Sequence, residues 1–339
     1  MIHSSKRVFY IIKYIVRYSQ YLWKHKSYTS KITTFLSHWL DVITYRDGQW
    51  EEVYFIEGKT DHHDGGKINP IDMKIDVNTT GTIVKWEPSE EFFTHPEVNI
   101  NELKTLFKTV AALCPGLTIN FKNHDELITY FSEKGLHDLV DDAVAGKELI
   151  DNRFDLKYAN GKNKIDMVMT YTSNYSMNII PYVNTGLTSV GPHITQIKSL
   201  LTREFNKFFK EKKWLKENED NLSGEDIQEG LYIVFNITAP NVAYDAQVKT
   251  RITRLEMTPF TAAIADELRV WFMANEKEIK AIADKAKMAK KAREAAQKAR
   301  DNIREKQAKK EKALKFDSKL ADCFSKDRKK CEIYITEGK

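Results

Sequence analysis

The first quarter of the chain alternates runs of β-forming residues with turn residues. Residues 42–45 and 53–56 are rich in β-branched and aromatic side chains. Asp47-Gly48 lies between them, and this turn pair favours positive φ at both positions. The pattern predicts a β-hairpin, and a further strand is expected over residues 82–86.

Residues 61–69 interrupt this pattern, because they are polar and contain glycine and histidine. We therefore expect a loop there. The pair His62-His63 lies in this segment, flanked by Asp61 and Asp64. Adjacent histidines on a loop seldom converge with the other ligands that a metal needs, so a solvated loop is the favoured interpretation.

Apolar residues at helical spacing predict three helices in the middle of the chain. The first ends at Cys114-Pro115-Gly116, and a second, short helix is expected around Leu127 and Phe131. The positions that indicate the first and third helices are Leu103, Leu106, Phe107 and Val110, and then Ile194, Ile197, Leu201, Phe205 and Phe208. Their aromatic residues are interpreted as core.

Three continuous apolar runs, residues 165–171, 179–183 and 231–238, predict buried strands. Thr258-Pro259 then predicts a helix start, with Thr258 as the N-cap. That helix is expected to end near Ala274, since Asn275 and Glu278 resemble the capping box of another helix.

From residue 279 onward most of the apolar residues are alanine, and lysine and arginine become frequent. No glycine lies between Gly230 and Gly338 and no proline follows Pro259, so we expect one long basic helix to about Ala313. The predicted architecture is a mixed sheet-and-helix domain followed by a helical stalk.

Composition narrows the class of protein. The 339 residues suffice for about two domains. Three cysteines are too few for a secreted disulfide framework, which favours a reducing cytoplasm. Residues 8–23 are apolar but are interrupted by Lys13 and Arg17, so we expect an amphipathic helix and no membrane anchor. The net charge of +5 says little by itself about partners.

Four short motifs stand out in order along the chain: residues 221–231 read NLSGEDIQEGL, 292–300 read AREAAQKAR, 319–323 read KLADC and 332–338 read EIYITEG. Together they resemble the ATPase-bearing subunit of bacterial-type type II DNA topoisomerases, that is, the gyrase B and topoisomerase IV proteins that carry the ATPase. Gln247-Val248-Lys249 is similar to the family's Q-T-K loop, with valine in place of threonine. The resemblance runs collinearly from about residue 37 to residue 338.

The resemblance implies an α+β fold. Residues 37–258 would form a transducer domain with a left-handed, ribosomal-protein-like β-α-β fold, and residues 259–313 the stalk. Residues 314–339 would begin the metal-binding TOPRIM cleavage domain, and residues 1–36 stay unassigned. The motifs do not separate gyrase from topoisomerase IV.

The resemblance also implies site residues. Lys249, with Gln247 beside it, matches the loop lysine that reaches the γ-phosphate of ATP, a role suited to a compact cation. Glu337 matches the glutamate that helps hold Mg²⁺ and acts in acid-base catalysis during strand cleavage. The family continues with paired aspartates, whereas Lys339 is the last residue here.

Double-stranded DNA is the expected partner of the stalk, with a solvated basic face as the alternative. The residues expected to contact phosphates are Lys290, Lys291, Arg293, Lys298, Arg300 and Arg304. The DNA-cleaving A-type subunit, the missing ATPase and TOPRIM pieces and a second copy are further expected partners.

The family's glycine-rich ATP lid has no counterpart, since no glycine precedes Gly48. We therefore expect this chain alone to bind neither ATP nor Mg²⁺ well and to be inactive. It would act as a fragment or split subunit of an ATP-dependent type II topoisomerase. Two alternatives stay open: a non-enzymatic DNA-binding or interaction protein with the same fold, and an inactive gene fragment.

Overall fold

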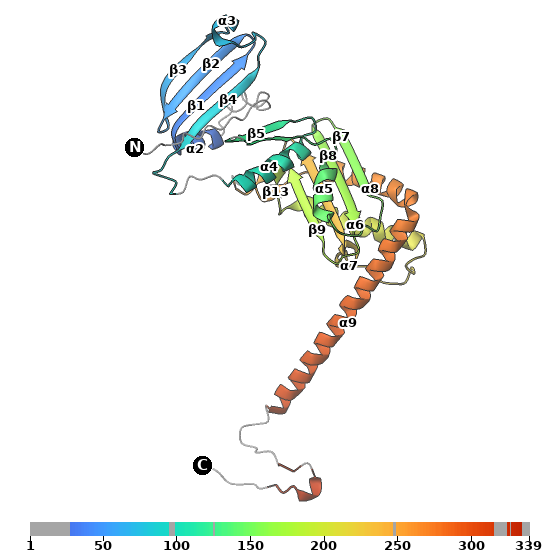
Figure 1. The fold of residues 1–339 in the computed structure, drawn as a ribbon. Helices are drawn as coiled ribbons and strands as arrows, with labels where there is room; N and C mark the ends of the chain where they lie inside the picture. Colours follow the sequence, from blue (N-terminus) through green and yellow to red (C-terminus); the bar gives the residue numbers. More distant parts are fainter. Residues whose placement is uncertain are drawn as a thin grey trace, which may run out of the picture.

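The computed structural model describes residues 28–94, 99–124, 126–246, 249–314, 324–325 and 327–333. Two sheet-containing units come first along the chain, and one long helix leaves the second unit (Figure 1). The predicted amphipathic helix over residues 8–23 lies outside the described residues. So do Gln247, Val248 and Glu337.

The first unit is a four-stranded antiparallel sheet in the order β3-β2-β1-β4. Its elements are α2 (Tyr28–Phe35), β1 (Ser37–Arg46), β2 (Gln49–Ile56), β3 (Lys59–Lys67), α3 (Pro70–Met73) and β4 (Gly81–Pro88). Asp47 and Gly48 both have positive φ, of 52° and 74°, where β1 turns into β2. The predicted hairpin and the strand over residues 82–86 are therefore confirmed.

The loop predicted over residues 61–69 is wrong, because β3 runs through most of it as an edge strand paired with β2. All nine residues of β3 are exposed, so neither of its faces needs apolar side chains. His63 Nε2 lies 2.8 Å from Glu51 Oε1, and the ring of His62 stacks on Tyr54. Strand β3 is held mainly by backbone pairing with β2, so its sequence shows no alternation of apolar and polar residues.

The second unit begins with α4 (Ile100–Leu113), β5 (Ile119–Asn123), β6 (Glu126–Tyr130) and α5 (Leu136–Val144). Helix α4 is as predicted. The short helix expected around Leu127 and Phe131 is wrong, because β6 pairs with β5 as a hairpin. A spacing of four residues also places two side chains on one face of a strand, so that signal was ambiguous.

A five-stranded sheet forms the centre of the second unit, in the order β10-β9-β11-β8-β7. Its strands are β7 (Phe154–Asn160), β8 (Asn163–Tyr171), β9 (Asn178–Val183), β10 (Gly186–Leu187) and β11 (Leu231–Thr238). Strands β9 and β11 are parallel, and the other pairs are antiparallel. All three strands predicted to be buried are present here.

Helices cover both faces of this sheet (Figure 1). Along β11, Ile233, Phe235 and Ile237 point to one core, and Tyr232 and Val234 point to the other. The first core is closed by α6 (Pro192–Glu211), α7 (Gly224–Gln228), α8 (Thr258–Ala274) and the start of α9 (Glu276–Leu314). The second core is closed by α4 and α5. The remaining elements are β12 (Ala243–Tyr244), β13 (Ile252–Arg254) and η1 (Arg328–Lys330).

The break between α8 and α9 falls where it was predicted, but the caps differ. Met257, not Thr258, is the N-cap of α8, and the Thr258 amide donates to the Glu256 carboxylate at 3.1 Å. Asn275 caps the end of α8, and its side chain donates to the Trp271 carbonyl at 2.9 Å. Helix α9 then runs unbroken for 39 residues, as the composition predicted.

Within the described residues, no helix has the length and apolar character needed to cross a bilayer.

The carboxylate of Asp151 is enclosed at one end of β8. It accepts hydrogen bonds from the Thr170 hydroxyl at 2.6 Å and from the Tyr171 amide at 3.0 Å. Burial raises the pKa of Asp151 to about 6, against the opposing effect of these hydrogen bonds. The folded protein therefore holds this proton more tightly than the unfolded chain does.

We expect the free energy of unfolding to decrease as the pH rises from about 4 to about 6, because the carboxylate loses its proton in that window. Asp151→Asn mimics the protonated acid. Relative to wild type, the variant should gain up to about 3 kcal/mol across this window. Urea unfolding at pH 4.0, 5.0, 6.0 and 7.5 measures the difference. A difference that does not vary with pH would contradict the assignment.

Candidate functional site

Lys249 lies in the connection between β12 and β13, and its side chain is exposed. Its φ is +59°, a left-handed conformation that non-glycine residues seldom adopt. Its amide donates to the Ala246 carbonyl at 3.1 Å, and its Nζ lies 5.8 Å from the centre of the Tyr244 ring. In the described part of the chain, no carboxylate forms an ion pair with Lys249.

This environment suits an anion. An exposed ammonium group without a carboxylate partner can donate to phosphate oxygens without first breaking an ion pair. Gln247 and Glu337, predicted to contact the nucleotide and Mg²⁺, lie outside the described residues. Among the described side chains, no three histidine, cysteine or acidic groups come together as a metal site.

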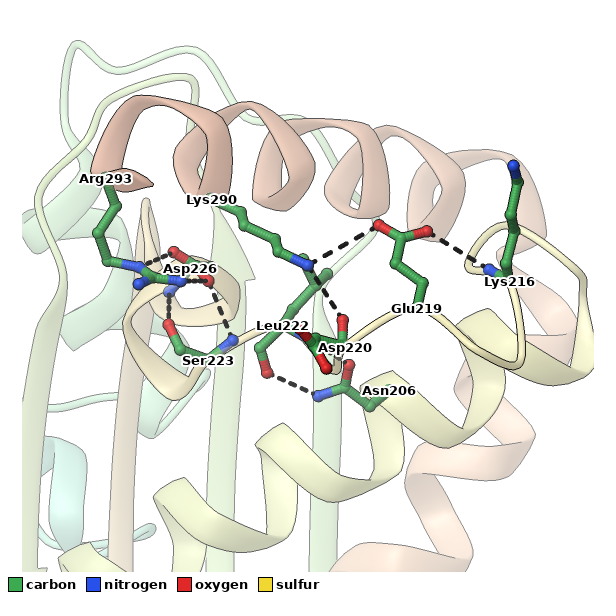
Figure 2. Close-up of polar contacts among 9 residues, drawn as sticks. All are labelled: Asn206, Lys216, Glu219, Asp220, Leu222, Ser223, Asp226, Lys290 and Arg293. Atoms are coloured by element: carbon green, nitrogen blue, oxygen red, sulfur yellow. Dashed lines mark hydrogen bonds and ion pairs between the residues drawn. The ribbon is translucent and has the colours of Figure 1, made fainter. Parts of the chain in front are cut away.

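The six predicted DNA contacts divide into two groups along α9. Arg293 packs against the second unit, where its Nε and one Nη each donate to the Asp226 carboxylate at 2.9 Å (Figure 2). Asp226 also accepts from the Ser223 amide at 3.0 Å, and its own amide donates to the Ser223 hydroxyl. These last two bonds are the capping box of α7.

The electrostatics of this pair favour the charged state of both groups. Burial raises the pKa of Asp226, but hydrogen bonds from Arg293 and Ser223 outweigh burial and leave that pKa below its ordinary value. The side chain of Asp226 is 2% exposed and that of Arg293 is 43% exposed. The carboxylate therefore depends on Arg293 for much of its neutralisation.

Lys290 binds the loop that leads into α7. Its ammonium group donates to the Asp220 carbonyl at 3.1 Å and lies 3.8 Å from Glu219 Oε1 (Figure 2). Asn206 of α6 holds this loop from beneath, because its side-chain amide bonds both the carbonyl and the amide of Leu222. Lys290 and Arg293 thus hold α9 against the second unit.

Lys285 makes a third attachment, closer to the start of α9. Its ammonium group donates to the Thr172 carbonyl at 2.6 Å and to the Asn174 carbonyl. Gly230 has a φ of +80°, and a Cβ there would collide with all three of these groups. Glycine is therefore required at position 230 for the helix to dock.

Beyond Arg293, α9 extends away from the second unit. Every residue from Glu294 to Gln307 is exposed, and the helix continues for roughly 30 Å after Arg293. At about 100° per residue, Arg300 and Arg304 continue the face that carries Lys290 and Arg293. Lys291 and Lys298 lie roughly 150° away on the helix surface. Within the part of the chain that the structure describes, no hydrogen bond or ion pair joins Lys249 to any of these six residues.

Comparison with known proteins identifies the family. The DNA gyrase B family model matches residues 135–302, which include most of the second unit and the docked half of α9. The chain is 32% identical over 315 residues to the DNA gyrase B protein of Thermotoga maritima, a match that covers 89% of this chain. The chain belongs to the DNA gyrase B family. It spans about half the length of the curated relatives it matches, 48% for the Thermotoga protein.

Solved structures agree with this placement. The ATP-binding domain of topoisomerase IV from Francisella tularensis has a TM-score of 0.65 and 25% identity, over 79% of this chain and 74% of that one. The 43K ATPase domain of Thermus thermophilus gyrase B has a TM-score of 0.63 over 82% of this chain and 75% of that one. At 24% identity, this second likeness concerns the fold. The chain thus belongs to the gyrase-B-like type II topoisomerase subunit family and has a mixed α+β fold.

Sequence reasoning overlooked the residues that hold the helix. Ser223 and Asp226 belong to the motif that carried the family resemblance, yet their structural role was not predicted. The signal was present, because a serine three residues before an aspartate is a capping-box pattern. The second role of Asp226, as the partner of Arg293, has no local signal because 67 positions separate the two residues.

Arg293→Ala should lower the unfolding midpoint by roughly 2–5 °C, because it leaves the buried Asp226 carboxylate without its cation. Arg300→Ala is the matched control, since it removes the same side chain from the free half of the same helix. The control should stay within about 1 °C of wild type. Differential scanning calorimetry at pH 7.5 compares the two, and equal midpoints would contradict the role given to Arg293.

Proposed function

We propose that this chain couples nucleotide state to DNA within an ATP-dependent type II topoisomerase assembled with the family's other parts. The observation that carries the proposal is Lys249, exposed, without an ion-pair partner in the described part of the chain, and held in a left-handed turn. In this proposal residues 37–258 act as the transducer, and Lys249, with Gln247, donates to the terminal phosphate of ATP bound by another part of the enzyme.

When bound, ATP supplies the phosphoryl group whose transfer releases free energy, and Mg²⁺ offsets its negative charge. The contribution of this chain would be the Lys249 ammonium, oriented toward the charge that develops on the terminal phosphate. Glu337 is assigned to the Mg²⁺-dependent cleavage site that the rest of a TOPRIM domain would complete. Strand cleavage would further require the A-type subunit, and the assembled enzyme would contain two copies of this chain.

The free half of α9 is proposed to bind duplex DNA. Residues 294–314 hold seven basic and four acidic side chains, so this half of the helix is positively charged. Of the six residues predicted to contact DNA, Lys298, Arg300 and Arg304 lie on the free half, and Lys291 is exposed on the docked half. Lys290 and Arg293 would act instead by fixing the direction of the helix.

A non-enzymatic DNA-binding role is the second candidate. The observation that favours it is the same exposed basic segment, which needs no nucleotide in order to attract phosphates. The two candidates differ in whether Lys249 matters to any activity of the assembled enzyme.

Lys249→Ala tests the nucleotide role. We expect this chain alone to show no Mg²⁺-dependent ATP hydrolysis. When the family's ATPase and TOPRIM parts and the A-type subunit are supplied in trans, Lys249→Ala should lower kcat for ATP hydrolysis roughly 100-fold. Lys213→Ala is the matched control, since Lys213 is also exposed with a positive φ of 58°. Equal rates for both variants would refute the nucleotide role and leave the DNA-binding candidate.

Paired substitutions test the DNA role. Lys291→Gln with Lys298→Gln removes one basic face, and Arg300→Gln with Arg304→Gln removes the other. Because the faces are roughly 150° apart, a straight duplex should contact one of them. The pair on that face should reduce the slope of log K against log salt by about 1.8, or 0.9 for each contact.

The control for net charge is Lys59→Gln with Lys67→Gln, on exposed β3 of the first sheet. This variant should leave the slope unchanged. Fluorescence anisotropy with a 30-base-pair duplex at several salt concentrations gives the slopes. If neither helix pair changes the slope, α9 does not bind DNA through these residues.

A further inference from the structure

The segment between β9 and α6 lies against the loop that carries Lys249. The Val190 amide donates to the Thr250 carbonyl at 3.4 Å, and the Ile252 amide donates back to the Val190 carbonyl at 2.9 Å. Val190 and Arg251 accordingly pair as an isolated parallel bridge. The conformation of residues 249–252 is thus set partly by residues about 60 positions earlier in the chain.

Thr188 is the residue of this segment that contacts Lys249 itself. It is fully buried, and its hydroxyl lies 3.3 Å from the Lys249 carbonyl and 3.1 Å from the Gly186 carbonyl. Its amide donates to the Pro181 carbonyl at 2.9 Å, which fixes Thr188 to strand β9. A left-handed lysine persists only when its surroundings hold it, and the Thr188 hydroxyl supplies one such contact by sharing its single proton between the Gly186 and Lys249 carbonyls.

His193 holds Thr188 from the other side. The imidazole is fully buried, and its Nε2 lies 2.9 Å from the Thr188 carbonyl. A carbonyl only accepts hydrogen bonds, so Nε2 carries the proton. Burial lowers the pKa of His193, against the opposing effect of the bond to Thr188. Among the described residues Nδ1 has no hydrogen-bond partner.

Two neighbours keep the imidazole in place. Its ring meets Phe235 of β11 edge-on, with 6.0 Å between ring centres. Gly191, with a φ of +153°, passes so close that a Cβ there would lie 2.9 Å from His193 Nδ1 and 3.0 Å from Ile252 Cβ. The glycine therefore lets the ring and β13 approach each other across the chain.

We propose that His193 and Thr188 are positioning residues for Lys249: the buried imidazole holds the Thr188 backbone, and the Thr188 hydroxyl holds the Lys249 carbonyl. The Lys249 backbone is thereby held in place before any phosphate arrives, which reduces the entropy lost on binding. This inference rests on the proposed function of Lys249 for its purpose, but the contacts can be tested in the chain alone.

Thr188→Val tests the contact, because valine keeps the shape of threonine and removes the hydroxyl. We expect backbone amides in a peptide covering residues 243–254 to exchange hydrogen roughly five-fold faster, the change expected from losing one hydrogen bond. Thr188→Ser retains the hydroxyl and should exchange like wild type. Mass spectrometry of the full chain follows this peptide beside peptides from α6 and β8, which should not change.

His193 is tested in the same way with two replacements. His193→Gln can keep an N–H donor near the Thr188 carbonyl, whereas His193→Leu cannot. The leucine variant should accelerate exchange in the loop peptide, and the glutamine variant should restore part of the protection. Unchanged loop exchange in Thr188→Val, or faster exchange spread equally over all peptides in that variant, would overturn the proposal.

The assembled enzyme separates this inference from the proposed function. Thr188→Val should lower kcat for ATP hydrolysis less than Lys249→Ala does, and Thr188→Ser should restore it. If Lys249→Ala has no effect, the proposed function fails, whereas the exchange data still decide whether Thr188 holds the loop. If Lys249→Ala lowers the rate while Thr188→Val leaves loop exchange unchanged, only the positioning role fails.

Discussion

The pairing of Arg293 with the buried Asp226 carboxylate fixes how the long helix leaves the body. Ile279, Ile282, Ala283 and Ala286 bury the apolar face of α9, but apolar contact is non-directional and tolerates sliding. A bidentate pair with two bonds of 2.9 Å defines one register and one orientation. Because Asp226 is also part of the α7 capping box, a change at this point affects the loop and the helix together.

The charges of α9 are accordingly divided by position. In the docked half, Lys285, Lys290 and Arg293 donate to carbonyls and carboxylates of the body, so their charge stabilises the fold. In the free half, lysine and arginine outnumber the acidic residues. A basic helix anchored at one end and exposed at the other can transmit a change in the body to whatever the exposed end binds.

Strand β11 joins the docked part of α9 to the segment beside Lys249. Just before its first residue, Gly230 leaves room for the Lys285 ammonium. Near its other end, the Ile237 carbonyl accepts from the Asn184 amide at 2.8 Å, in the segment that leads to Thr188 and the lysine loop. Six of the eight strand residues belong to the two cores, so β11 is packed on both faces. It lies between the segment beside Lys249 and the docked part of α9.

The sequence by itself determined the elements whose side chains carry a period or lack a breaker: the hairpin at Asp47-Gly48, the three buried strands and the unbroken course of α9. The ordered motifs also determined the family. Only the tertiary structure decided that β3 and β6 are strands, which of six basic residues on one helix bind the second unit, and that His193 and Thr188 support Lys249. The physical reason is that these outcomes depend on partners. Backbone pairing at a sheet edge leaves no side-chain pattern, and a lysine or arginine has the same letter whether a distant carboxylate neutralises it or water surrounds it.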